Sequence, residues 1–552
     1  MEHHLTTYIT HDTLISALGF GTQENLEAIR SYHSGITLQT DKRIADTPLL
    51  AATISQERLQ QQAETAGISA YPRMEQLFIL TINELIRQSG QTLEDKTCGL
   101  ILSTTKGIAG YFHAEERVHV ISNACISGVS ALIAGKRMIE NGIYRKVIVV
   151  GGDLLSHFIT SGFLSFRSLS SRPCRPYDSN RDGLNLGEAC GAVLLSTEKT
   201  PNSIILSGGA ISNDANHISG PSRTGDGLFF AIRQAMQEAG TALQNISFVN
   251  AHGTATVYND EMESKALTLA HLEQVPTHSL KPYFGHTLGA SGIIESIVCM
   301  HELKQGILFG TPGYETPGVP MPIPVYATHR SIPMKHCVKT ASGFGGCNAA
   351  IVLSLPEYAP FKDEDNTLPE IRCTREVRIE NSSVFINNEL IFHSEEPDFG
   401  IFIRDTYKKS GGNNMKFYKM DDLCKLGYVA AEYLLKDKTF APLEMGMLLA
   451  NATSSLHTDI RHQQLIDQDG DRAASPAVFV YTLPNVVSGE ICIRHKIQGE
   501  NTFFITKAYQ PEKLERYARI VMQKGKLNYC IIGWCELLKN TYKAVFKLIE
   551  KQ

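Results

Sequence analysis

Apolar and polar positions recur along the chain with the spacings of helices and of buried strands. Residues 74–88 and 129–141 read as amphipathic helices. Residues 98–104, 146–152 and 191–196 are short apolar runs typical of buried strands. Because apolar runs alternate with helical stretches, we expect a layered α/β fold.

Polar and proline-rich stretches interrupt this pattern. Residues 171–187 are rich in Ser, Arg, Asp, Asn and Gly and predict a long loop, and residues 311–323 carry four prolines and predict an irregular connection. Near residues 363–366 the composition turns polar and acidic. The boundaries placed there give a first domain at 1–358, a linker at 359–369 and a second unit at 370–552.

The second unit reads as a partial copy of the beginning of the first domain. MEQL precedes CGLILSTTKG (98–107), much as MDDL precedes MGMLLANATS (445–454). Further on, IENGIYRKVIVVGGDLL (139–155) parallels MQKGKLNYCIIGWCELL (522–538). Generic α/β sequences can produce single matches by chance, but several matches in the same order favour a duplication.

Composition and charge restrict the classes of function. The chain has 552 residues, of which 43% are hydrophobic and 20% charged, as expected of a globular protein with more than one core. A net charge of −5 gives no support for nucleic-acid binding. The sequence shows no secretory signal and no apolar run of about eighteen residues, so no membrane span is predicted. Twelve cysteines without metal-type spacing predict reduced thiols in a cytoplasmic protein.

Four short motifs could carry chemistry. Cys125, in Asn-Ala-Cys-Ile-Ser-Gly, lies between an apolar strand and a helix of small residues, where a helix dipole favours the nucleophilic thiolate. His252 enters a loop of Gly and Thr, and His286 follows Gly285 in a segment that begins at Lys281. Residues 342–348 (SGFGGCN) form a turn whose amides could face an oxyanion. Taken singly, each motif also has a structural explanation: a buried Cys, a capping or core His, tight helix packing or a plain turn.

In this order, the four motifs resemble those of the β-ketoacyl synthases of the thiolase superfamily. The runs RPYD (175–178), RDG (181–183) and LGE (186–188) resemble the polar loop and buried Glu of that family. The resemblance covers most of residues 1–355 and is strong from residue 118 onward. A Cys-His-His set is that of the elongating synthases.

The resemblance implies a fold and an activity. The fold is the thiolase fold, with α-β-α-β-α layers and two mixed five-stranded sheets, followed by a partial thiolase-like α/β unit. The activity is that of a 3-oxoacyl-[acyl-carrier-protein] synthase, an acyltransferase of fatty-acid or polyketide and polyene biosynthesis. Its partners are an acyl carrier protein and malonyl and acyl thioesters. Substrates arrive on phosphopantetheine, and neither a metal nor a redox cofactor is implied.

The same resemblance assigns roles to individual residues. Cys125 would hold the acyl chain, and His252 and His286 would bind the malonyl thioester. Lys281 and Glu188 would orient His286 and tune the local field. The substrate-binding residues would be two threonines on the phosphopantetheine arm, a gate at the acyl pocket and a glycine of the same turn, namely Thr254, Thr256, Phe344 and Gly345.

The chain departs from the family before the strand of the nucleophile. Residues 105–117 are too short for a segment that, in the family, contributes to the dimer interface and caps the acyl pocket. The second unit contains this segment at 475–505, yet has Tyr509 or Ala508 where the first has Cys125. We expect a homodimer or an internal pseudo-dimer in which residues 370–552 rebuild the missing wall. The alternative is a second half that folds separately and contributes nothing.

Other functions also fit parts of the sequence. A non-condensing acyl-binding protein, similar to a chain-length factor, would accommodate the missing segment. An acyltransferase or hydrolase would use Cys125 without condensation. A degradative thiolase would need a second catalytic Cys, for which Cys347 is a candidate.

Overall fold

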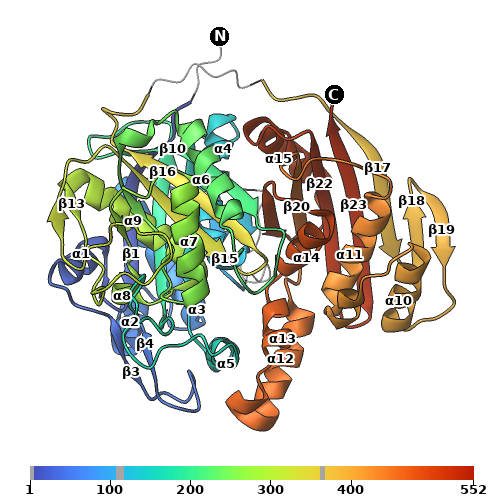
Figure 1. Ribbon diagram of the computed structural model, residues 1–552, viewed down its shortest axis with the longest axis horizontal. Coiled ribbons are helices and arrows are strands. Elements are labelled where there is room, and N and C mark those ends of the chain that lie inside the picture. The colour runs from blue at the N-terminus through green and yellow to red at the C-terminus, as the bar shows by residue number, and fades with distance from the viewer. Residues whose placement is uncertain (1–4, 107–116, 361–366) are drawn as a thin grey trace.

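The protein consists of two α/β units of unequal size that lie side by side (Figure 1). The computed structural model describes residues 5–106, 117–360 and 367–552. Most of the shortened segment 105–117 and part of the predicted linker therefore lie outside the described residues. The proposed domain boundaries fall between β16 (Cys347–Ser354), the last strand of the first unit, and β17 (Ile371–Glu380), the first strand of the second.

Two mixed sheets of five strands form the first unit. One sheet has parallel pairing among its first three strands and antiparallel pairing after them, in the order β6 (Val118–Ile121), β5 (Cys98–Ser103), β7 (Lys146–Asp153), β9 (Ala189–Ser196) and β1 (Tyr8–Ser16). The other has the order β10 (Ile204–Asn213), β16, β15 (His336–Gly343), β11 (Ile246–Asn250) and β12 (Thr277–His278).

Helices separate the two sheets and cover their outer faces. Between the sheets lie α4 (Ser127–Glu140) and α9 (Ser291–Gln305), both buried along almost their whole length. The first sheet is covered by α3 (Arg73–Ser89), and the second by α6 (Asp226–Ala239), with α7 (Val257–Leu269) beside it. The predicted α-β-α-β-α layers are confirmed, as are the predicted helices and strands, whose ends differ by at most a few residues.

Small residues allow the two central helices to touch. A Cβ atom on Gly128 would come within 2.8 Å of the backbone nitrogen of Ile293, and one on Gly292 within 2.4 Å of that of Val129. Real Cβ contacts are not this short, so both glycines are needed for the crossing. Part of the small-residue pattern after His286 is therefore explained by packing.

The second unit repeats the first sheet strand for strand. Its order is β21 (Asn501–Ile505), β20 (Met445–Asn451), β22 (Tyr529–Leu538), β23 (Thr541–Lys551) and β17, with the same sequence of parallel and antiparallel pairings. The hairpin β18 (Ser383–Ile386) and β19 (Glu389–His393) extends the outer edge. The places of α3 and α4 are taken by α11 (Asp422–Leu434) and α15 (Pro511–Lys524). The duplication is confirmed for this sheet, and the described residues contain no second copy of the β10–β12 sheet.

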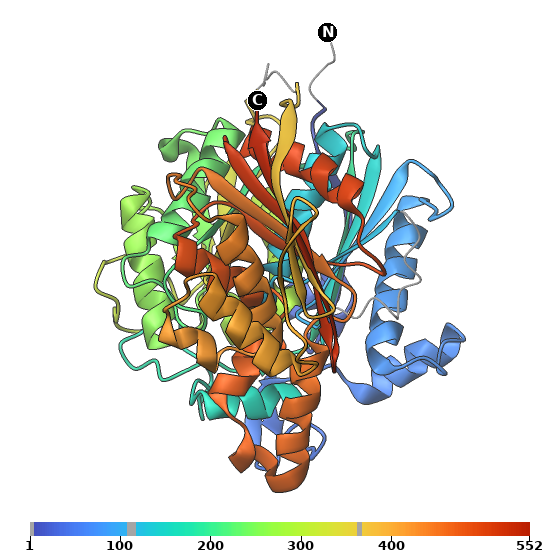
Figure 2. The same cartoon turned by 90° about the vertical axis from the view of Figure 1, so that its right-hand side faces the viewer.

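Two edge strands join the units into one continuous sheet. β6 pairs antiparallel with β21, placing Ile121 opposite Phe504 and Val120 opposite Ile505. Asn123 extends the pairing, since its side chain accepts from the Phe503 amide at 2.8 Å and donates to the Asn501 carbonyl at 3.2 Å. The pairing covers a strand edge that would otherwise expose unpaired backbone groups. Figure 2 shows the sheet from the side of the second unit.

An arm of the second unit also reaches the first unit. It contains α12 (Leu456–Asp469), α13 (Pro476–Phe479) and α14 (Val486–His495), and both α12 and α13 contact α5 (His157–Ser165). This arm includes most of the segment 475–505 that the first unit lacks. Within the described residues no single helix has the length and apolarity to cross a membrane; one bent pair, 476–482 with 486–495, meets those two criteria jointly.

Buried charges lie across the junction. Arg137 of α4 forms an ion pair with Glu500, immediately before β21, and neither side chain is more than 3% exposed. The neighbouring Lys136 binds Glu140 at 2.7 Å and Glu238 at 2.6 Å. Because water is excluded here, each charge depends on its partner. The ion pair between Arg137 and Glu500 therefore couples the folding of one unit to the presence of the other.

Replacing Glu500 by Gln should lower the free energy of unfolding by about 3–5 kcal/mol, because Arg137 would stay buried without its ion-pair partner. Urea unfolding followed by circular dichroism measures the change. Glu198→Gln is the control: this carboxylate also pairs with an arginine, Arg145, but both side chains are more than 60% exposed. Its loss should cost at most about 1 kcal/mol. Equal effects of the two substitutions would contradict the account.

Candidate active site

Cys125 lies in the tight turn between β6 and α4, within the short 3-10 helix Ala124–Ile126. Ala124 has φ of 48°, a left-handed conformation that residues other than glycine seldom adopt. The Ser127 hydroxyl stabilises the turn by donating to the Ala124 carbonyl at 2.6 Å and accepting from the Asn123 amide at 2.9 Å. The turn places Cys125 at the start of α4, and the backbone N–H groups of Cys125 and Phe344 donate toward its sulfur.

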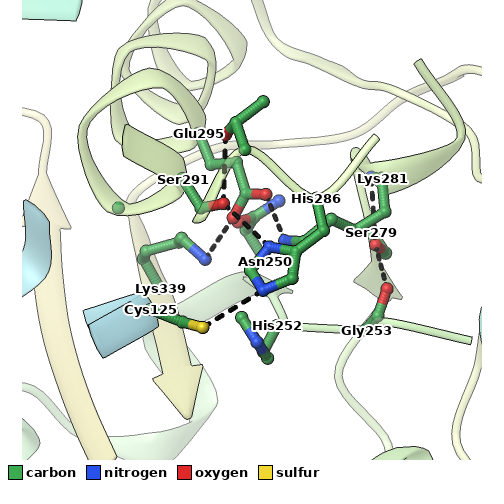
Figure 3. A network of polar contacts seen from close by, with 12 residues as sticks. Cys125, Asn250, His252, Gly253, Ser279, Lys281, His286, Ser291, Glu295 and Lys339 are labelled. Atoms are coloured by element: carbon green, nitrogen blue, oxygen red, sulfur yellow. Dashed lines mark hydrogen bonds and ion pairs between the residues drawn. The ribbon is translucent and has the colours of Figure 1, made fainter. Parts of the chain in front are cut away.

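Both predicted histidines lie beside this sulfur (Figure 3). Nε2 of His286 is 3.2 Å from Sγ of Cys125, and its Nδ1 is 3.2 Å from the Ser291 hydroxyl. The rings of His252 and His286 are 5.0 Å apart, centroid to centroid, and almost perpendicular. Three motifs separated by up to 161 positions along the chain thus meet in one buried site.

The polar loop seen in the sequence supports His252. The Glu263 carboxylate accepts the backbone N–H groups of His252 and Gly253, each at 2.7 Å, and the Tyr177 hydroxyl at 2.9 Å. Asp260, on the same helix as Glu263, accepts the Tyr177 amide at 2.8 Å. The RPYD run at 175–178 is therefore the scaffold of the histidine loop.

Two buried lysines make the site electropositive. Glu295 forms ion pairs with Lys281 and with Lys339, the latter at 2.6 Å, and none of the three side chains is more than 1% exposed. Burial, followed by the charge of Lys281, holds the pKa values of His252 and His286 well below the ordinary histidine value. Burial also raises the pKa of the Cys125 thiol to about 12. The resting site is therefore a neutral thiol beside two neutral imidazoles.

The structure corrects the predicted role of Glu188. Its carboxylate binds the Arg73 guanidinium through both oxygens at 2.7 Å and accepts the backbone N–H groups of Ile54 and Leu155. The carboxylate beside Lys281 belongs to Glu295 instead. Sequence reasoning missed three charged residues of the site: Glu263, Glu295 and Lys339. Glu295 and Lys339 stand alone among largely apolar neighbours, whereas Glu263 is one of several charges on α7.

A cavity of about 330 Å³ opens onto Cys125. Its walls include Thr254 and Thr256, whose hydroxyls are 2.8 Å apart. Phe344 forms another wall and packs on Phe163 and Phe166, with ring centroids 6.2 and 5.3 Å away. Gly345 lies in the same turn as Phe344. It has φ of 89°, which glycine adopts readily, and it donates its N–H to the Ile218 carbonyl at 2.6 Å.

The second unit contacts the same walls. Phe479 packs on Phe163, with centroids 5.6 Å apart, and Asn485 donates its side-chain N–H to the Phe344 carbonyl at 2.8 Å. A Cβ atom on Gly162 would come within 2.2 Å of the Phe479 ring, and one on Gly489 within 2.7 Å of the Gly345 carbonyl. Both glycines therefore permit the contact between the units.

Neither the second unit nor Cys347 supplies a second thiol to the cavity. The position in the second unit that corresponds to Cys125 lies between β21 and α15, in residues 506–510. These residues include Ala508 and Tyr509 and no Cys. Cys347 is buried, and its thiol faces the Phe344 carbonyl at 3.3 Å. Cys125 is thus the one thiol among the described residues lining the cavity.

Sequence comparisons match the first unit to a known family. A model of the β-ketoacyl synthase N-terminal domain matches residues 106–200, and that of the C-terminal domain matches residues 204–315. A putative mitochondrial 3-oxoacyl-[acyl-carrier-protein] synthase of Schizosaccharomyces pombe is 30% identical over 259 residues, 42% of this chain and 60% of its own. A putative polyketide β-ketoacyl synthase 1 of Streptomyces cyaneus is 31% identical over 268 residues, 45% of this chain and 63% of its own. The chain spans about 60% of the length of such relatives.

Solved structures share the fold. The PfaC keto synthase–chain length factor superposes with a TM-score of 0.79 at 12% identity, covering 99% of this chain and 78% of its own. The ketosynthase ApeO of Xenorhabdus doucetiae, solved with its chain length factor ApeC, covers 64% of this chain and 98% of its own, with a TM-score of 0.56 at 24% identity. Both halves of the family's sequence model match the first unit in chain order, so residues 106–200 and 204–315 are similar to the β-ketoacyl synthases.

Proposed function

We propose that the protein is a 3-oxoacyl-[acyl-carrier-protein] synthase that joins a malonyl unit to an acyl chain held on Cys125. The observation that carries the proposal is the 3.2 Å contact between Cys125 Sγ and His286 Nε2 in a buried cavity, with His252 beside it. The relatives are named as a 3-oxoacyl-[acyl-carrier-protein] synthase and a polyketide β-ketoacyl synthase, which supports this class of reaction.

Acyl transfer begins at the thiol. Sγ of Cys125 attacks the thioester carbonyl of the acyl donor, and the thiol proton passes to the departing carrier thiolate, so that His286 keeps its own proton on Nε2. A new S–C bond forms on Cys125, the old thioester bond breaks, and the carrier leaves as a thiol. The backbone N–H groups of Cys125 and Phe344 are placed to stabilise the oxyanion of the tetrahedral intermediate.

Condensation uses both imidazoles in their neutral form. Their N–H groups donate to the carbonyl oxygen of the malonyl thioester and stabilise the enolate that forms as the bond to the carboxylate breaks and CO2 leaves. The enolate carbon attacks the acyl carbonyl on Cys125. A C–C bond forms, and Cys125 departs as a thiolate that takes up a proton. Burial and the cations Lys281 and Lys339 favour these neutral imidazoles.

The second unit acts, in this proposal, as an internal pseudo-partner that completes the acyl pocket. Its support is the contact of Phe479 with Phe163 and of Asn485 with the Phe344 carbonyl. An internal partner also occupies β6, the edge through which a homodimer would otherwise form.

An acidic acyl carrier protein is the proposed macromolecular partner. A groove of about 910 Å³ adjoins the Cys125 cavity and shares Tyr258 with it. Three cationic side chains, Arg223, Lys265 and Lys496, line this groove together with three acidic ones, Asp214, Asp226 and Glu261. Cationic groups around a mouth attract an acidic partner. A reducing, cytoplasmic compartment belongs to the same proposal and is supported by twelve free cysteines.

Incubation with malonyl- and acyl-carrier protein tests the reaction directly. Mass spectrometry should detect an acyl group on Cys125, release of CO2 and a β-keto product two carbons longer. Cys125→Ala should abolish both acylation and condensation, and His286→Ala should slow condensation by about 10²–10⁴-fold. Acylation without condensation would indicate an acyltransferase, and no acylation a non-condensing acyl-binding protein; either result would overturn the proposal.

The neutral resting state predicts a pH dependence. Because burial raises the pKa of Cys125 to about 12, the thiolate fraction should increase about tenfold per pH unit throughout pH 6–9. The rate of iodoacetamide labelling of the Cys125 peptide, measured by mass spectrometry, should follow it. The exposed Cys373 provides an internal control for reagent access. A rate that is constant below about pH 7.5 would reveal a thiolate–imidazolium pair and contradict this account.

Phe479→Ala should enlarge the acyl pocket from the side of the second unit. The removed ring packs on Phe163 and Phe166, so Cys125 should accept acyl chains at least two carbons longer than the wild-type limit. Mass spectrometry of the acyl-enzyme across a series of chain lengths measures the limit. Phe440→Ala, which removes a ring that packs on Tyr529 within the second unit, is the matched control. An unchanged limit in Phe479→Ala would show that this unit does not bound the pocket.

A further inference from the structure

A cluster of ligand-type side chains lies in the core of the first unit, and the proposed mechanism does not use it. Its members come from β11, β12, α9 and β15, and none is more than 1% exposed: Asn250, His278, Cys299, Glu302 and Cys337. The cluster lies behind His252, because Asn250 is the last residue of the strand that leads to that histidine.

Three donor atoms converge in this cluster. Nε2 of His278 is 3.4 Å from Oε2 of Glu302. One ligand atom from each of His278, Glu302 and Cys299 lies within 4.8 Å of the other two. Cys299 and Glu302 are three positions apart on α9 and so share one face of the helix.

Several polar atoms of the cluster have no hydrogen-bond partner in the described part of the chain. They are Oε2 of Glu302, Oδ1 of Asn250 and Nδ1 of His278. Leaving one such group unpaired inside a protein costs about 1–3 kcal/mol. Nδ2 of Asn250 is 3.2 Å from Nε2 of His278. The nitrogen and oxygen of an amide are nearly indistinguishable in shape, so the Asn250 side-chain amide can be rotated by 180°. Oδ1, which has no partner, then takes the place of Nδ2 and faces Nε2 of His278.

We propose that this cluster is a structural zinc site in which His278, Cys299 and Glu302 bind the ion and the Asn250 oxygen completes a tetrahedron. Zn²⁺ binds nitrogen and oxygen ligands at about 2.0–2.2 Å, so neighbouring ligands of a tetrahedral site lie ~3.4 Å apart. The observed separations of 3.4 and 3.2 Å match this edge length. Complete burial is typical of a closed, structural site rather than a catalytic one.

Neighbouring groups would orient these ligands. The Phe309 amide donates to Oε1 of Glu302 at 2.7 Å, which leaves Oε2 for the ion. Cys337 is hydrogen-bonded to Cys299 and can donate its S–H to a zinc-bound thiolate. Such supporting hydrogen bonds around the ligands are a regular feature of zinc sites.

The charges of the cluster agree with the proposal. With Zn²⁺, the carboxylate and one thiolate together neutralise the ion. The nearby cation Lys339 has its own counter-charge in Glu295.

Such a site could not be predicted from the sequence because the ligands come from three separate segments. Only Cys299 and Glu302 are close in sequence, and an interval of three positions on a helix is too common to indicate a metal. The proposal departs from the expectation that no residue of this chain binds a metal, and it concerns stability rather than catalysis.

Glu302→Gln distinguishes a core that binds zinc from a core that is free of metal. Glutamine has the shape of a protonated glutamate, and its amide can donate to His278, so in a metal-free core the substitution should leave Tm unchanged. In a zinc site it removes an anionic ligand, so zinc should be lost and Tm should fall. Cys492→Ser, which alters an equally buried Cys outside the cluster, is the matched control and should retain its zinc.

Zinc content is measured by elemental mass spectrometry on the full chain, as purified and after refolding in excess zinc chloride. The wild type should hold about one zinc per chain and Glu302→Gln almost none. The proposal is overturned if the wild type holds almost no zinc in both preparations, or if Glu302→Gln keeps the wild-type Tm. Neither readout uses enzyme activity, so the result is independent of the proposed condensation.

Discussion

The pairing of β6 with β21 is the contact on which the rest of the structure depends. It joins strands almost 400 positions apart, and it lies two residues before the turn that carries Cys125. Backbone hydrogen bonds at this edge fix the register, and a slip by one residue would turn every side chain of the strand to the opposite face. The position of Cys125 therefore depends in part on the second unit.

Burial determines the electrostatics of the site. It is the largest cause of the shifted pKa values of Cys125, His252 and His286. Two lysines that share a single carboxylate add to the shift of both histidines. An exposed site with the same residues would hold partly protonated histidines, which suit the proposed stabilisation of an enolate less well.

Cys125, both histidines and the layered fold could be predicted from the sequence because each left a local signal. An apolar strand followed by a small-residue helix marked Cys125, and the ordered matches between the two units revealed the duplication. The partner of Lys281 could not be predicted in this way, since it depends on how α9 crosses the first sheet. Glu188 and Glu295 are both single acids among apolar residues, and only the packing shows that Glu295 contacts the lysine.

The contacts between the units could not be predicted from local sequence patterns, because they also depend on packing between distant segments. Phe479 is one aromatic residue among many, and its place beside Phe163 follows from the β6–β21 register and from the absence of a side chain at Gly162. Sequence reasoning could identify the segment 475–505 as the piece that the first unit lacks. It could not determine whether that piece would lie against the first unit's cavity. This depends on the pairing of β6 with β21, two strands far apart in the sequence, and the hydrophobic pattern along the chain does not show which strands pair.

The central claim is that the second unit forms a wall of the pocket in which Cys125 holds its acyl chain. Its most direct test is to load Cys125 of the full-length protein with an acyl chain that ends in a diazirine, irradiate it and map the cross-linked peptides. The account predicts a cross-link from the Cys125-bound chain to the peptide that contains Phe479. Cross-links confined to residues of the first unit would contradict it.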